Sequence, residues 1–220
     1  MASSNLLAGA GLLVALTAAG AARAQTPERY FIRGGPAYAV FDGSARVSVA
    51  GQRAPGNSAT IKHNEGVAIE GGVRLSPDWS VSLTVGVPPT AKLYGAGAFD
   101  KVGHLGSANY GPSALIVQRY LPKVGKLEPY VGAGVSYTII LDSKDAAIQG
   151  LQINNGVGPT IQVGAEYPIA RRLALFVDAK KIWVKVDATG AAPSPIGPQR
   201  VEARVTLNPV IFNTGLSYHF

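Results

Sequence analysis

The fold is decided by the alternation in the C-terminal stretch Val210-Ile211-Phe212-Asn213-Thr214-Gly215-Leu216-Ser217-Tyr218-His219-Phe220. Its even positions carry Val, Phe, Thr, Leu, Tyr and Phe, whereas its odd positions carry Ile, Asn, Gly, Ser and His. Because successive side chains of a β-strand point to opposite faces, this pattern predicts a strand with one apolar and one polar face. The terminal aromatic residue leads us to expect that the strand closes a sheet or is recognised during assembly.

The composition is poor in charge for a chain of 220 residues. Charged residues make up 15% of it, against about 25% in an average soluble domain. The chain contains 27 glycines and no cysteine, so a disulfide, a thiol nucleophile and a thiolate metal site are all excluded. The formal net charge is +7, but the basic residues are scattered, and no basic run of the kind that binds nucleic acid is visible. We therefore expect one domain with little water-facing surface and no nucleic-acid partner.

The N-terminal residues have the pattern of a secretory signal peptide. Residues 6–19 are apolar or small, and Ala22-Arg23-Ala24 places small residues three and one positions before a cleavage point. The run is shorter than the roughly 20 residues that a membrane-spanning helix needs. We expect a cleaved signal peptide over 1–24 and a single domain over 25–220. If this domain lies in a membrane it must be a closed barrel, because only helices and barrels satisfy every backbone group in lipid.

Eight segments are expected to be strands, namely residues 30–41, 65–75, 79–87, 109–120, 127–140, 158–167, 173–186 and 201–220. The connections alternate in length, with short turns at one end and the long loops 42–64, 88–108, 142–156 and 187–199 at the other. One helical turn is expected between Ser143 and Leu151, and a break in the last strand at Asn208-Pro209. This layout predicts an all-β, eight-stranded antiparallel transmembrane barrel with short periplasmic turns, long extracellular loops and periplasmic termini.

Alternation alone does not separate a membrane barrel from a lipocalin-like barrel whose apolar face points inward. The polar face here is mostly Gly, Ser, Thr and Ala, which suits a narrow interior better than a water-facing surface. Its few charges have both signs and could pair inside a barrel. Aromatic residues mark the strand ends and would form the interfacial girdles, with Tyr30, Trp79, Tyr120, Tyr167, Tyr218 and Phe220 near the turns and Tyr137 and Trp183 near the loops. Together these features favour lipid outside the barrel.

Several stretches match, in order, the pattern of a known family: residues 29–35, 112–120, 129–134, 163–167, 178–182 and 208–220. On these stretches the chain resembles the OmpW family, which includes the AlkL-type hydrocarbon uptake barrels. It departs from the family pattern at Asn208 and Val210, which flank the final proline, and at His219. The resemblance implies a porin-like barrel in the outer membrane of a Gram-negative bacterium. It also implies a narrow channel that passes small hydrophobic molecules through a gap in the wall.

An eight-stranded barrel has room only for its own side chains or for one small ligand. We expect the periplasmic half of the interior to be closed by a polar plug made of Arg33, Glu70, Arg74, Gln162, Glu166, Asp178 and Lys180. The expected pairs join Glu70 to Arg74 or Arg33, and Lys180 to Asp178 or Glu166. The alternative is a purely structural role, since buried polar groups satisfy one another in any barrel.

Prolines near the loop side of the strands predict interrupted pairing, because proline cannot donate a ladder hydrogen bond. Two neighbouring strands carry them near the same rim, in the third and fourth segments. We expect a lateral opening there, on a transport path formed by Val87, Pro88, Pro89, Leu93, Tyr94 and Pro112. Ordinary termination of the strands would explain the same prolines.

Two functions from different classes fit these observations. The first is passive passage of small hydrophobic molecules, and the alternative is a closed structural or interaction barrel whose extracellular loops bind surface partners. We do not expect an enzyme, a cofactor or a metal site, since the three histidines form no catalytic or metal-ligand spacing with other residues. The expected partners are outer-membrane lipids, lipopolysaccharide, small hydrophobic ligands and the barrel-assembly machinery. That machinery would read the apolar face of the last strand, which carries Phe212, Leu216, Tyr218 and Phe220.

Overall fold

A computed structural model of the chain describes residues 28–42, 44–49, 51–53, 57–61, 63–97, 100–192 and 197–220. The expected signal peptide lies outside these residues. The strands are β1 (Tyr30–Val40), β2 (Ser44–Val49), β3 (Gln52–Arg53), β4 (Asn57–Ile61), β5 (Asn64–Arg74), β6 (Trp79–Gly86), β7 (Thr90–Gly97), β8 (His104–Tyr120), β9 (Glu128–Asp145), β10 (Gln149–Ile153), β11 (Gly156–Pro168), β12 (Leu173–Ile182), β13 (Lys185–Ala192), β14 (Gln199–Thr206) and β15 (Val210–His219). One short 3₁₀ helix, η2 (Asp100–Val102), precedes β8. Among the described residues no helix is long and apolar enough to cross a membrane.

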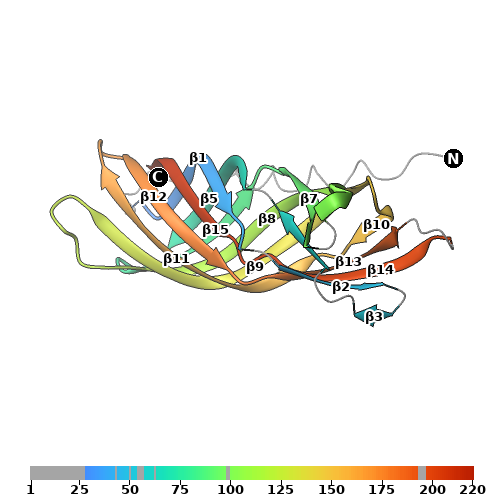
Figure 1. The fold of residues 1–220 in the computed structure, drawn as a ribbon. Helices are drawn as coiled ribbons and strands as arrows, with labels where there is room; N and C mark the ends of the chain where they lie inside the picture. Colours follow the sequence, from blue (N-terminus) through green and yellow to red (C-terminus); the bar gives the residue numbers. More distant parts are fainter. Residues whose placement is uncertain are drawn as a thin grey trace, which may run out of the picture.

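Eight of these strands close into an antiparallel barrel in the order β1, β5, β6, β8, β9, β11, β12 and β15. The last of them, β15, pairs with β12 on one side and with β1 on the other, so it closes the ring (Figure 1). At the end of this seam Tyr30 and Phe220 exchange two backbone hydrogen bonds of 2.9 Å. The predicted eight-stranded antiparallel barrel is therefore confirmed.

The barrel has a turn end, where the short connections 75–78, 121–127 and 169–172 lie, and an opposite loop end. At the loop end, β8 and β9 extend beyond the barrel. The separate strands β7, β10, β13 and β14 also lie beyond it. In Figure 1 these strands extend to the right of the barrel, together with β2 and β3. We call this part the extension. Its sheets have the orders β10-β13-β14-β2-β3 and β4-β7-β8, and its apolar core contains Val47, Val186, Val201 and Val205.

The extension corrects our expectation of four long loops. The supposed loop 142–156 contains the end of β9 and all of β10, so the helical turn expected between Ser143 and Leu151 is wrong. Instead the Asp145 carboxylate accepts hydrogen bonds from the backbone N–H groups of Gly150 and Leu151, at 2.7 and 2.9 Å, and closes the turn between β9 and β10. β2, β7 and most of β13 also fall in expected loops, because their many Ala, Gly, Ser and Thr residues give weak hydrophobic alternation. Most of β14 lies in the expected strand 201–220. The break expected at Asn208-Pro209 is present between β14 and β15.

The apolar face of every barrel strand points outward. The exposed side chains include Val67, Ile69, Leu83, Val85, Leu115, Val117, Val131, Val135, Ile161, Val163, Leu175, Val177, Phe212 and Leu216. The expected girdle aromatics are exposed as well, with one exception. Tyr120 is only 7% exposed and points inward, where its hydroxyl accepts a hydrogen bond of 2.6 Å from Nη2 of Arg33. Its side chain lies on the same face of β8 as the buried Gln118 and Ile116. The sequence of this segment did not indicate which face of the strand points inward.

Candidate functional site

The interior of the barrel is crossed by a cluster of polar side chains. Strand alternation turns these residues inward, and each of them is at most 3% exposed: Arg33, Glu70, Gln118, Gln162, Glu166, Asp178 and Lys180. We call this cluster the polar plug. Six of its seven members were expected from the sequence, and Gln118 was not.

Arg33 is held on every side of its guanidinium group. Nη1 lies 2.9 Å from Oε1 of Glu70, and Nε lies 2.7 Å from Oε1 of Glu166. The rings of Phe31 and Tyr130 cover the guanidinium, with centroids 4.3 and 4.5 Å from its carbon. Aromatic faces attract a cation in this position. Because its donors and its faces are engaged by the protein, Arg33 is a fixed element of the plug rather than a ligand-binding group.

The remaining contacts extend the polar plug across the interior of the barrel. Nζ of Lys180 lies 2.8 Å from Oδ1 of Asp178 and 3.1 Å from Oε2 of Glu70. Gln118 donates to Oε1 of Glu70 and to Oε1 of Gln162, both at 2.8 Å. These groups come from β5, β8, β11 and β12, which stand around the whole barrel wall. A continuous water-filled pore is therefore closed at this level.

Two of the expected ion pairs are present and two are not. Glu70 pairs with Arg33 and Lys180 with Asp178. Arg74 lies four residues from Glu70, about 13 Å along a strand, and its Nη2 instead lies 3.4 Å from Oε2 of Glu128 at the turn end. Glu166 does not reach Lys180, because the register of β11 and β12 places Gln162 opposite Lys180. Nη2 of Arg74 also lies 3.9 Å from Oε2 of Glu166, so Arg74 borders the plug on the turn side, with 21% of its side chain exposed.

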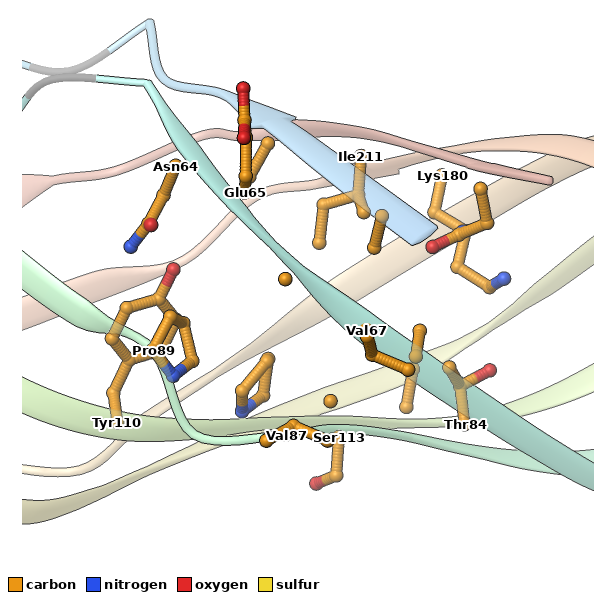
Figure 2. Close-up of a pocket in the computed structure, with 18 of the residues that line it drawn as sticks. Asn64, Glu65, Val67, Thr84, Val87, Pro89, Tyr110, Ser113, Lys180 and Ile211 are labelled. Atoms are coloured by element: carbon orange, nitrogen blue, oxygen red, sulfur yellow. The ribbon is translucent and has the colours of Figure 1, made fainter. Parts of the chain in front are cut away.

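A small cavity of about 60 Å³ lies directly above the plug, between β1, β5, the β6–β7 connection and β8. We call it the side cavity (Figure 2). Lys180, Thr84 and Asn213 form its polar floor, whereas small apolar side chains such as Ala37 and Ala68 form much of its wall. Val67 and Val87 also line it, although their side chains are 46% and 55% exposed on the outside of the barrel. Residues from the inner face and from the outer face of the barrel wall therefore border the side cavity.

Backbone pairing is interrupted beside this cavity. The ladder between β6 and β8 ends at Val85 and Ser113, and it resumes between β7 and β8 at Thr90 and Asn109. Pro112 lies in this interval and has no N–H to donate. On the other side, the last paired residues of β5 and β6 are Ala68 and Gly86, and the backbone N–H of Val87 still donates to the carbonyl oxygen of Val67 at 2.8 Å.

Two further apolar cavities continue toward the loop end. The middle cavity, of about 40 Å³, shares Tyr110 with the side cavity. The upper cavity, of about 330 Å³, lies in the extension and shares Leu93, Ala188 and Val205 with the middle cavity. The shared residues show that the three cavities follow one another from the extension down to the plug.

The structure brings together part of the transport path expected from the sequence. Val87, Pro89 and Pro112 line the side cavity, and Leu93 lines the middle and upper cavities. Pro88 is exposed next to them, and the ring of Tyr94 packs on that of His104, with centroids 5.5 Å apart. The sequence reading missed Ala37, Ala68, Tyr110, Ile211 and Asn213. Ala37, Ala68 and Ile211 could have been found as small or apolar residues at inward positions near the loop side of their strands, whereas Tyr110 and Asn213 do not have this pattern.

The expected assembly residues form one exposed row on β15 and beyond it. They are Phe212, Leu216, Tyr218 and Phe220. The rings of Tyr218 and Phe220 are stacked with centroids 6.0 Å apart, and Tyr30 stacks on Phe220 at 5.9 Å. In the described part of the chain, no group of three or more His, Cys, Asp or Glu residues could hold a metal ion.

A closed barrel with an apolar exterior, aromatic girdles and a polar interior defines an integral outer-membrane β-barrel. Residues 29–220 match the model of the OmpW family, and the chain belongs to this family. It is therefore an outer-membrane protein of the OmpW and AlkL type.

Individual relatives support this assignment. The chain is 36% identical over 180 residues to dibenzothiophene metabolism operon protein PahQ of Pseudomonas aeruginosa, covering 82% of this chain and 83% of that protein. It is 29% identical over 174 residues to outer membrane protein AlkL of Ectopseudomonas oleovorans, covering 79% and 74%. The crystal structure of outer membrane protein OprG from Pseudomonas aeruginosa has the same fold, with a TM-score of 0.81 at 23% identity over 87% of this chain and 95% of OprG.

Proposed function

We propose that the barrel is a passive route by which small hydrophobic molecules enter the outer membrane. They enter the extension, pass through the upper and middle cavities, and leave through the side cavity into the hydrocarbon region. The observation that carries this proposal is the border of the side cavity, where outward-facing Val67 and Val87 meet inward-facing Ala37 and Ile211 directly above the plug.

Such a molecule meets two surfaces in the barrel, an apolar one in the cavities and a charged one in the plug. Apolar surface transferred out of water is stabilised by about 25 cal/mol per Å², so the apolar cavities favour a hydrophobic molecule. The charged plug below offers it no comparable gain, and passing through it would break buried ion pairs. The lateral route into lipid is the favourable one. The name of PahQ, from a dibenzothiophene metabolism operon, is consistent with hydrophobic cargo.

The same architecture supports one orientation of the barrel in the membrane. The turn end with both termini would face the periplasm, and the extension would lie at the cell surface after cleavage of a signal peptide over 1–24. A short epitope inserted at Gly51, whose φ of +78° marks a turn in the extension, should be accessible to antibody on intact cells. Labelling only after the outer membrane is broken would reverse this orientation.

Uptake of naphthalene into vesicles with a lipopolysaccharide outer leaflet tests the route. Ala39→Trp would fill the side cavity, which Ala39 lines. Val135→Trp, on the exposed outer face of β9, is the matched control. We expect protein-dependent uptake with wild type and Val135→Trp, and a loss of most of it with Ala39→Trp. A closed interaction barrel predicts no protein-dependent uptake at all, and equal uptake by both variants would refute the side cavity as the exit.

A further inference from the structure

The floor of the side cavity is polar, although its wall is mostly apolar. Three side chains form this floor, and all three are anchored to the plug. Oγ1 of Thr84 donates to Oε2 of Glu70 at 2.8 Å, Nζ of Lys180 donates to Asp178, and Nδ2 of Asn213 donates to Oδ1 of Asp178 at 2.7 Å.

The contact with Asp178 fixes the orientation of the Asn213 amide. An ionised carboxylate only accepts hydrogen bonds, so the amide nitrogen must face Asp178. The amide oxygen then faces elsewhere, and Oδ1 of Asn213 accepts no hydrogen bond from the described residues. Asn213 is 4% exposed, and a buried acceptor without a donor is unfavourable. Among the described residues, the hydroxyl of Ser82 is the other unpaired buried side-chain group, but Ser82 does not line the side cavity.

The surroundings of this oxygen select the donor that would satisfy it. The ammonium group of Lys180 lines the same floor and disfavours a cationic amine. The carboxylates of Asp178 and Glu70 lie immediately behind the floor and disfavour an anion, and a carboxylate group has no hydrogen to donate. A neutral hydroxyl group fits both constraints, and the apolar wall above it fits a hydrocarbon body.

We propose that Asn213 is a specificity-determining residue that accepts a hydrogen bond from the hydroxyl group of a passing molecule. The preferred cargo is then a small apolar molecule with one hydroxyl, such as a phenol or an alcohol, rather than the bare hydrocarbon. This inference rests on the proposed function, because it concerns the cargo of the same side cavity.

Three probes of one skeleton test the proposal on the unaltered protein in lipid nanodiscs. Naphthalene has no polar group, 1-methoxynaphthalene has the oxygen without the hydrogen, and 1-naphthol has both. After binding to empty nanodiscs is subtracted, we expect 1-naphthol to bind about three- to tenfold more tightly than the other two, the ratio for one neutral hydrogen bond. Equal affinities of 1-naphthol and 1-methoxynaphthalene would overturn the proposal.

Variants separate the hydrogen bond from general effects on the barrel. Asn213→Leu should remove the preference for 1-naphthol while naphthalene still binds, whereas Ser82→Ala, which alters the other unpaired group, should keep the preference. A preference that survives in Asn213→Leu would also contradict the assignment. If naphthalene enters vesicles through the protein but all three probes bind alike, only the cargo assignment fails. If no probe enters vesicles through the protein, both the proposed function and the cargo assignment fail.

Discussion

Nζ of Lys180 on β12 lies 3.1 Å from Oε2 of Glu70 on β5, although β15 and β1 stand between these two strands in the wall. The ion pair therefore spans part of the bore instead of joining neighbours. Both side chains are at most 4% exposed, so neither charge has water to compensate it if the other is removed. The pair and its neighbours hold the barrel closed at this level.

Removing the cation should destabilise the barrel. Lys180→Met leaves Glu70 and Asp178 without their shared partner, and breaking a buried pair in this way costs about 3–5 kcal/mol. We expect a loss of this size in the free energy of unfolding by urea in lipid vesicles. The exposed Lys185→Met is the matched control and should change it by less than about 0.5 kcal/mol. A stability of Lys180→Met equal to that of the control would show that the plug contributes little to folding.

The seam between β1 and β15 should not tolerate a side chain at two facing glycines. A Cβ atom at Gly215 would overlap the carbonyl oxygen of Gly34, and one at Gly35 would overlap that of Thr214. We expect Gly215→Ala to reduce the folded, heat-modifiable form seen on gels, because the backbones must separate where the ring closes. Gly71→Ala, where a Cβ meets no atom within 4 Å, should fold normally. Normal folding of both variants would mean that the seam can widen at little cost.

The terminal aromatic residue should matter more for assembly in cells than for stability. Phe220→Ala keeps the backbone hydrogen bonds with Tyr30 and loses the ring stacking, so we expect a stability loss of only about 1 kcal/mol. Its level in the outer membrane should nevertheless fall severalfold. Leu175→Ala, which truncates an equally outward side chain on β12, should reach the membrane normally. Wild-type membrane levels of Phe220→Ala would argue against a role in recognition.

The turn between β9 and β10 should weaken in acid. The backbone N–H groups of Leu151 and Gly150 hold the pKa of Asp145 below its ordinary value. A carboxyl group whose pKa is lowered by folding contributes stability above its unfolded pKa and loses it as the pH falls through the folded value. Amide protection factors at Gly150 and Leu151 should therefore stay constant from neutral pH to about pH 5 and fall below about pH 4. In Asp145→Asn they should not depend on pH, and a pH-independent wild type would exclude the carboxylate as the cause.

The barrel could be predicted from the sequence because lipid outside and a packed interior impose a period of two on every wall strand. Leu175, Val177 and Phe176 illustrate this, since the first two are exposed and the third is buried. The partners of the interior charges could not be predicted, because they depend on strand register. Glu166 faces Phe176 rather than Lys180, and no local pattern encodes this offset. Apart from β14, most of the extension was missed, because its short strands are stabilised mainly by contacts with one another.

The breaks in the wall strands have a consequence for how this protein can be altered. Val210 pairs with both Val40 and Lys181, so the first residue of β15 lies level with the ends of β1 and β12. Among the described strands, β8, β9 and β11 continue past this level without a break, since Ile161 of β11 pairs with Lys181 and the strand runs on to Gly156. The membrane segment and the extension are therefore joined by three continuous strands. A chimera that takes its extension from a relative and keeps this membrane segment would need these three strands matched residue for residue.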